Sequence, residues 1–328
     1  MQEIKIGPNE AGQRLDKFLH KLMPLAPSSF FYRMLRKKNI TLNEKKAEGK
    51  EKLEEGDTLI LYLSDDTINN FKEAQSKVAD KVTEYEEAYR KLTGIQVLYE
   101  DEHILIMNKP AGVLSQKAED TDFSLNEWMI GYLLSEFDKN QLFTYKPSVC
   151  NRLDRNTSGL VVGAKSLTGS QEMNRLFRSR EISKYYRMFV KGKVTEEKTL
   201  EGYLLKDEET NMVYLTDRGS KGAAFIRTRY YPIREYSDRT LVEAELITGK
   251  SHQLRIHMAS VGHPLIGDYK YGDRAFNESY KRKYHINSQL LYACRLEFPE
   301  MNPPFGHLSK KVFEAPIPGN FQILAGRE

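Results

Sequence analysis

One short segment places a carboxylate between two guanidinium groups. Residues 151–159 read Asn-Arg-Leu-Asp-Arg-Asn-Thr-Ser-Gly, a run of turn-forming residues that leads into an apolar strand predicted over residues 160–164. If the segment is extended, Arg152 and Asp154 project to the same side, where the neighbouring cation keeps the carboxylate ionised. An ionised carboxylate can act as a nucleophile or a base, although an ion pair that closes a loop would use the same residues.

A second group of polar side chains follows another predicted strand. Lys250, His252, Arg255 and His257 come soon after the apolar residues 241–247, and their donors suit a carboxylate or a phosphate. The two histidines are five residues apart, which puts them on a common side of neither a helix nor a strand. No cysteine or carboxylate completes a ligand set at a familiar spacing, so the sequence predicts no metal site.

In a third segment, residues 182–192, apolar and polar residues alternate as they do in a strand. This period places Tyr186, Met188 and Val190 on one face. Tyr186 therefore belongs to an apolar set, where a tyrosine ring ordinarily fills space and its hydroxyl reaches an acceptor.

These segments need elements that position them. From residue 94 onward, short apolar stretches alternate with turn signals, which predicts a strand-rich domain with intervening helices over residues 94–328. Residues 1–63 predict a small domain of two short helices packed on a small sheet, including a strand over residues 58–63. Residues 64–93 lack proline and glycine and keep a helical period, which predicts a partly helical linker.

The composition narrows the class of protein. The chain of 328 residues has a net charge of +4, two cysteines and no apolar run long enough to cross a bilayer, so a cytoplasmic location is expected. Basic residues concentrate in the second predicted helix, after three consecutive aromatic residues, where they could contact phosphates or simply form a solvated face. These candidates for nucleic-acid binding are Arg33, Arg36, Lys37 and Lys38.

Four motifs in order resemble the RluA-type pseudouridine synthases. The family patterns N-K-P-A-G, H-R-L-D-x-x-T-S-G, K-x-Y-x-A-x-V-x-G and T-G-R-x-H-Q-I-R-x-H correspond to residues 108–112, 151–159, 184–192 and 248–257. Residues 291–298 are similar to the family's closing strand. Residues 1–63 resemble an S4 RNA-binding domain.

The resemblance implies an α+β fold, in which a mixed, mainly antiparallel β-sheet with peripheral helices forms an RNA cleft. It implies that Asp154 is the catalytic carboxylate, that Tyr186 packs on a flipped uracil and mediates proton transfer, and that Arg255 pairs with Asp154. Arg152 would fill the space that the uridine leaves. No cofactor is expected. Besides the four basic residues of the second helix, the expected RNA-binding set comprises Lys109, Asn151, Arg152 and His252.

The implied chemistry breaks the C1′–N1 bond, turns the uracil and joins C5 to the same sugar carbon. Asp154 could attack C1′ and form an ester, or remove a C2′ proton and form a glycal, and the sequence leaves both routes open. Two departures from the family affect the surroundings of the nucleotide. Asn151 stands where the family has histidine, and residues 113–116 replace a histidine-containing stretch.

Structured RNA is the expected partner. The S4-like region favours large-subunit (23S) ribosomal RNA, while transfer RNA offers similar splayed uridines and remains an alternative. A monomer is expected. Two other functions stay open, namely an RNA-binding protein that acts in ribosome assembly without catalysis, and a glycosylase-like hydrolase that would release free uracil.

Overall fold

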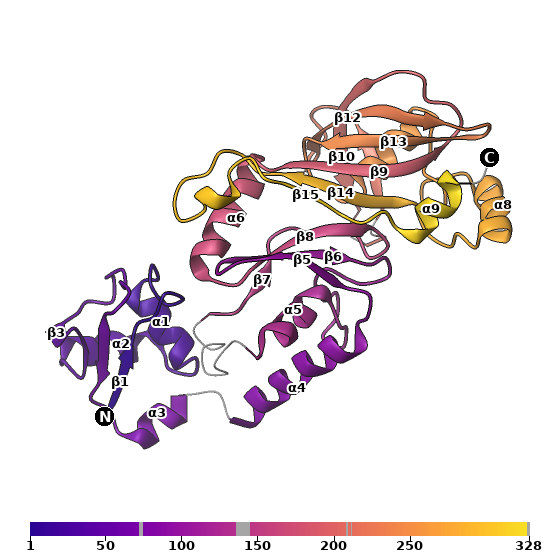
Figure 1. Cartoon of the computed structure of the whole chain (residues 1–328). Helices are drawn as coiled ribbons and strands as arrows, with labels where there is room; N and C mark the ends of the chain where they lie inside the picture. The colour runs from indigo at the N-terminus through magenta and orange to yellow at the C-terminus, as the bar shows by residue number, and fades with distance from the viewer. Residues whose placement is uncertain (72–74, 136–144, 208, 211, 327–328) are drawn as a thin grey trace.

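The computed structural model describes residues 1–71, 75–135, 145–207, 209–210 and 212–326. The chain forms a small N-terminal module and a larger part built on one extensive sheet (Figure 1). Within the described ranges, no helix is long and apolar enough to cross a membrane.

The N-terminal module contains two helices on a four-stranded antiparallel sheet of order β1-β4-β2-β3. Its helices bury the apolar residues that recur at helical spacing, such as Phe18 and Leu19 in one and Phe31 and Leu35 in the other. The predicted helices and small sheet are therefore present, although the strand predicted over residues 58–63 already ends at Leu61. Its elements are β1 (Gln2–Lys5), α1 (Leu15–Leu22), α2 (Ser28–Arg36), β2 (Ile40–Leu42), β3 (Lys45–Lys46) and β4 (Thr58–Leu61).

Two helices occupy the segment predicted as a partly helical linker, α3 (Asp65–Phe71) and α4 (Gln75–Lys91). Helix α4 packs along α5 (Leu125–Leu133), where the Tyr89 ring lies 5.5 Å from that of Trp128. The backbone of the two helices is close enough that a Cβ on Gly131 would lie 2.2 Å from the Tyr85 carbonyl oxygen. Helix α4 therefore forms part of the packing of the larger unit.

The larger unit is organised by a sheet of eleven strands in the part of the chain that the structure describes. Its main path runs β11-β10-β12-β13-β9-β14-β8-β6-β5, with β15 on β14 and β7 on β8. The strand pairs described are antiparallel apart from β14 with β8, so the predicted mixed, mainly antiparallel sheet is confirmed. The strands are β5 (Gln96–Glu100), β6 (Ile104–Lys109), β7 (Ser148–Val149), β8 (Ser158–Ala164), β9 (Ser183–Lys191), β10 (Lys198–Lys206), β11 (Val213–Thr216), β12 (Ala224–Glu235), β13 (Arg239–Leu246), β14 (Leu291–Glu297) and β15 (Val312–Glu314).

Helices cover both faces of this sheet because successive strand residues point to opposite sides. Along β6, Met107 packs into the core that contains Met129 of α5, while Ile106 packs into the core that contains Met173 of α6. Helices α8 and α9 cover one end of the sheet, where Tyr280 and Phe321 join a separate core. The remaining helices are α6 (Leu167–Ser179), α7 (Gln253–Ser260), α8 (Arg274–Tyr284), α9 (Gly319–Ala325) and the 3₁₀ turn η2 (Gly306–Leu308).

Strand β14 joins two segments that are distant in the sequence. Ala293 lies opposite Gly159 of β8 in the parallel pairing and opposite Tyr186 of β9 in the antiparallel pairing. Gly159 has a φ of +110°, and a Cβ there would lie 2.2 Å from the Ala293 carbonyl oxygen. A glycine at this position therefore lets the start of β8 approach β14 closely.

Candidate active site

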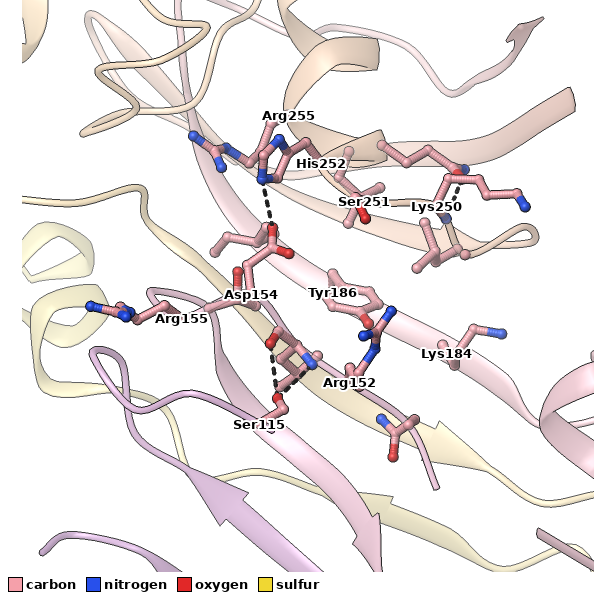
Figure 2. A pocket seen from close by; sticks show the side chains of 18 of the residues that line it. Ser115, Arg152, Asp154, Arg155, Lys184, Tyr186, Lys250, Ser251, His252 and Arg255 are labelled. Carbon is pink, nitrogen blue, oxygen red and sulfur yellow. Dashed lines mark hydrogen bonds and ion pairs between the residues drawn. The ribbon is translucent and has the colours of Figure 1, made fainter. Parts of the chain in front are cut away.

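A cavity of about 860 Å³ opens beside the loop that connects β7 and β8. Its wall combines that loop with residues 114–118, with β9, with the start of α7 and with the end of α6, so it gathers side chains from distant parts of the sequence. Figure 2 shows the side chains around Asp154. The cavity brings together most of the predicted site residues, namely Asn151, Arg152, Asp154, Tyr186, His252 and Arg255.

Asp154 lies in the β7–β8 loop with one third of its side chain exposed, at 33%. The loop turns because the Thr157 N–H donates to the Asp154 carbonyl oxygen at 3.0 Å. On the preceding residue, both backbone groups of Leu153 bond to the Ser115 hydroxyl. The backbone on each side of the carboxylate is thus held, while its oxygens face the cavity (Figure 2).

Tyr186 lies on β9 beside Asp154, and only 7% of it is exposed (Figure 2). It packs with Met188 and Val190 in one core cluster, so the predicted strand face is confirmed. Burial, and next the nearby Asp154 charge, raise the pKa of Tyr186 well above its ordinary value. The phenol therefore stays protonated at neutral pH and presents a neutral ring and a hydroxyl to the cavity.

Arg255 does not form the expected pair with Asp154. Its Nε and Nη2 donate to the two carboxylate oxygens of Asp268 at 2.7 Å each, and both side chains are buried. The guanidinium edge formed by Nε and Nη2 is therefore committed to Asp268. Arg255 lines the cavity, but the orienting contact predicted for it is wrong in this structure.

His252, which carries a positive charge when it is protonated, faces Asp154. It caps α7 with a left-handed backbone (φ 57°), and its Nε2 lies 4.0 Å from Asp154 Oδ2 (Figure 2). Its Nδ1 lies 2.8 Å from the Tyr271 hydroxyl, which also accepts the Val213 N–H at 3.1 Å. Burial lowers the pKa of His252, while Asp154 opposes that effect, so the imidazole favours its neutral form.

Lys109 does not line the cavity, contrary to its predicted role in RNA binding. The side chain is fully buried, and its ammonium donates to the carbonyl oxygens of Pro110, Val113 and Arg155 at 3.1, 2.7 and 3.1 Å. Burial lowers the pKa of Lys109 to about 7, although Asp154 raises it. Lys109 therefore connects the turn after β6 to the loop that carries Asp154. The sequence around Lys109 does not reveal this role.

Asn151 reaches the cavity but its amide is already engaged. Its Oδ1 accepts the Val162 N–H at 2.8 Å, and its Nδ2 donates to the Leu160 carbonyl oxygen at 3.3 Å. This residue, which replaces the family histidine, thus holds the start of the loop against β8. Arg152 extends along the cavity wall beside Tyr186 (Figure 2).

Further cations line the cavity that sequence reasoning did not assign to it. Of the described residues that line it, ten are lysine or arginine and Asp154 alone is acidic. Three of these cations lie close together in the sequence, within residues 178–184. The others come from strands and loops far apart in the chain. The unassigned residues are Lys117, Arg155, Arg178, Arg180, Lys184, Lys206 and Lys270.

The basic residues of the N-terminal module form a separate surface. Arg33, Arg36, Lys37 and Lys38 are all exposed on α2 or directly after it, and none of them lines the cavity. The Arg33 guanidinium lies 6.0 Å from the centre of the Phe30 ring. Phe30 and Phe31 are buried in the module, so Tyr32 is the exposed member of the aromatic run.

Comparisons with known proteins agree with this arrangement. The family model described as RNA pseudouridylate synthase matches residues 103–260. The chain is 31% identical over 300 residues to the ribosomal large subunit pseudouridine synthase C of Vibrio cholerae, covering 91% of this chain and 89% of the relative. It is 30% identical over 319 residues to the protein of the same name from Escherichia coli K12, covering 96% and 92%.

The fold is shared with a solved structure. Human RNA pseudouridylate synthase domain containing 4 superposes with a TM-score of 0.57 at 20% identity, over 73% of this chain and 95% of that one. The sheet, the cavity around Asp154 and the sequence similarity over nine tenths of the chain lead to one conclusion. The chain belongs to the RluA family of RNA pseudouridine synthases and is an isomerase.

Proposed function

We propose that this enzyme isomerises uridine in large-subunit ribosomal RNA, with Asp154 as the catalytic carboxylate. The observation that carries the proposal is that Asp154 is the one acidic residue among ten cations in the described lining of the cavity. Such a lining attracts a polyanion and leaves one carboxylate to meet the sugar of a nucleotide. The choice of ribosomal RNA follows the names of the relatives from Vibrio cholerae and Escherichia coli.

The reaction conserves all atoms of the nucleotide. The C1′–N1 bond breaks, the uracil turns within the cavity, and C5 bonds to C1′. C5 then loses its proton and N1 gains one, so the composition of the nucleotide is unchanged. Asp154 either attacks C1′ to give an ester or takes a C2′ proton to give a glycal, and both routes require the carboxylate next to the sugar.

The neighbours of Asp154 have complementary roles in this proposal. The base must leave its stack to reach the carboxylate, which costs a few kcal/mol in a duplex and less in a loop. Arg152, on the cavity wall, would occupy the vacated space. The neutral Tyr186 would pack its ring on the uracil and carry a proton through its hydroxyl. Arg255, anchored by Asp268, would hold the wall of the cavity.

We propose further that residues 1–63 are an S4-like RNA-binding domain, that residues 64–93 connect it, and that residues 94–328 are the catalytic domain. The support is the exposed basic surface of Arg33, Arg36, Lys37 and Lys38 on α2. Deletion of residues 1–63 should weaken RNA binding and reduce the salt dependence of the Kd. An unchanged salt slope would show that this surface does not bind phosphates.

The central test is pseudouridine mapping, by carbodiimide labelling and reverse transcription, of total RNA from cells that lack the gene. Complementation with wild type should restore defined sites in large-subunit RNA, and Asp154→Asn should restore none. Restored sites in transfer RNA alone would refute the proposed substrate. Free uracil as a product would indicate a hydrolase, and no change at any site would favour a non-catalytic RNA-binding protein.

The oligomeric state and the location of the protein complete the proposal. We expect a monomer that acts in the cytoplasm, where ribosomal RNA is modified. Light scattering during size-exclusion chromatography would measure the mass against that of one chain of 38.0 kDa. A mass near twice that value would refute the monomer.

A further inference from the structure

The Ser115 hydroxyl contacts both backbone polar groups of one residue in the active-site loop. Its Oγ donates to the Leu153 carbonyl oxygen at 2.8 Å and accepts the Leu153 N–H at 2.9 Å (Figure 2). Ser115 is 3% exposed and lies in the segment that departs from the family pattern. Leu153 directly precedes Asp154, so this side chain acts one residue away from the catalytic carboxylate.

These two hydrogen bonds satisfy the backbone N–H and C=O of Leu153, as the pairing with a neighbouring strand does inside a sheet. Leu153 is buried, and it lies between β7 and β8 rather than within either strand. A buried backbone N–H or C=O that lacks a partner costs about 1–3 kcal/mol. The Ser115 hydroxyl satisfies both groups of Leu153, and it thereby defines where the chain enters the Asp154 turn.

Ser115 is itself fixed to the start of α5. Its carbonyl oxygen accepts the Asn126 N–H at 3.3 Å and the Ser124 hydroxyl at 3.4 Å, and the neighbouring Leu114 carbonyl oxygen accepts the Leu125 N–H at 2.8 Å. Helix α5 packs on α4 and on the sheet core. A continuous set of contacts therefore runs from a well-packed helix through Ser115 to the backbone of the active-site loop.

We propose that Ser115 is a positioning residue for isomerisation, because it orients Asp154 through Leu153. The inference rests on the proposed role of Asp154. A displacement of about 1 Å in a catalytic group can reduce a rate by about 100-fold. Loss of the hydroxyl would leave two buried backbone groups without their partner, and the loop would move to recover other partners. Substrate binding, which depends on the many cations of the cavity, would change little.

The test compares variants in single-turnover isomerisation of an RNA fragment that contains a uridine modified by the wild type. Ser115→Ala should lower the rate constant by about 10- to 100-fold, while the Kd for the RNA stays within about twofold. Ser115→Thr retains the hydroxyl and should recover most of the rate. Ser115→Cys, whose side chain has a similar volume and forms weaker hydrogen bonds, should give an intermediate rate.

Ser166→Ala provides the matched control. Ser166 is also buried, and its hydroxyl accepts the Gly169 N–H at 3.0 Å at the start of α6, away from the Asp154 loop. This variant should lose thermal stability as Ser115→Ala does, with an unchanged rate constant.

Two outcomes would overturn the proposal. One is a rate for Ser115→Ala and Ser115→Cys within twofold of wild type, and the other is an equal loss of rate in Ser166→Ala. Asp154→Asn, measured in the same assay, separates this question from the proposed function. If that variant isomerises uridine, the role of Asp154 fails; if it is inactive, the Ser115 variants report on positioning alone.

Discussion

The Arg255 guanidinium binds both carboxylate oxygens of Asp268, from Nε and Nη2 at 2.7 Å each. Asp268 also accepts the N–H groups of Lys270 and Tyr271 at 2.9 and 3.1 Å. The pair therefore ties α7 to the loop that carries Tyr271, which in turn contacts His252 beside Asp154. One buried ion pair thus shapes the cavity wall opposite the loop that carries Asp154.

Asp268→Ala should destabilise the protein by about 3–5 kcal/mol, because it leaves the Arg255 guanidinium buried without its partner. Urea unfolding monitored by tryptophan fluorescence would measure the loss. Glu196→Gln is a control, because it breaks an ion pair with Lys198 on the surface and should not change the unfolding midpoint. A loss of stability in both variants would mean that charge alone, rather than burial, sets the effect.

Gly159→Ala should destabilise the protein by at least about 2 kcal/mol, because its Cβ would overlap the Ala293 carbonyl oxygen and its φ is positive. Gly262→Ala is the matched control. Gly262 also has a positive φ, of +84°, but nothing lies within 4 Å of its Cβ position. If the two variants lose equal stability, backbone strain accounts for the effect and the close approach of β14 does not.

Stability should fall in mild acid because of His257. Burial lowers the pKa of this histidine from 6.5 to about 4, so the folded state prefers the neutral ring. The contribution is complete above pH 6.5, where folded and unfolded chains are both neutral, and it is lost as the pH falls from 6.5 to about 4.

Removal of the titrating ring isolates this effect. Between about pH 7.5 and about pH 5, His257→Gln should lose about 2 kcal/mol less unfolding free energy than wild type. The measurement is urea unfolding at both pH values, with Ile256→Val as a control on the same helix. Equal pH dependence in wild type and His257→Gln would refute the assignment.

Arg178→Gln should weaken RNA binding through the loss of one phosphate contact. Arg178 is exposed at the end of α6 and lines the cavity. The slope of log Kd against log salt should fall by roughly 0.7–0.9, while the rate with saturating RNA stays unchanged. Arg282→Gln removes the same charge from α8, outside the described cavity lining, and should leave the slope as it is. Equal slopes in all three proteins would place Arg178 away from the RNA.

The sequence predicted local features of the fold well, because they depend on short-range periodicity. The face of β9 that carries Tyr186 and the helices of the N-terminal module follow from spacing alone. The partner of Arg255 does not follow from spacing. Asp154 and Asp268 carry the same charge, and only the folded geometry selects Asp268. The predicted RNA contact of Lys109 fails for a similar reason. The local sequence does not distinguish a lysine that donates to three buried carbonyl oxygens from one that contacts a phosphate.

The site also depends on strand order, which no local pattern contains. The cations of the cavity come from α6, α7, β9, β10 and several loops, and they converge because the sheet brings these elements together. Ser115 gave no signal except its departure from the family pattern. Its importance follows from one pair of backbone contacts that only the structure reveals.

The position of β14 also determines when the enzyme becomes competent during its synthesis. Asp154 and Tyr186 both precede β14 in the chain, and the strand that pairs with Gly159 and with Tyr186 begins only at Leu291. Strand pairing between segments so distant in the chain forms slowly and late. A nascent chain that has not yet extended through β14 therefore carries every proposed catalytic residue without the strand that brings them together. The growing polypeptide therefore lacks an assembled site until β14 has been synthesised.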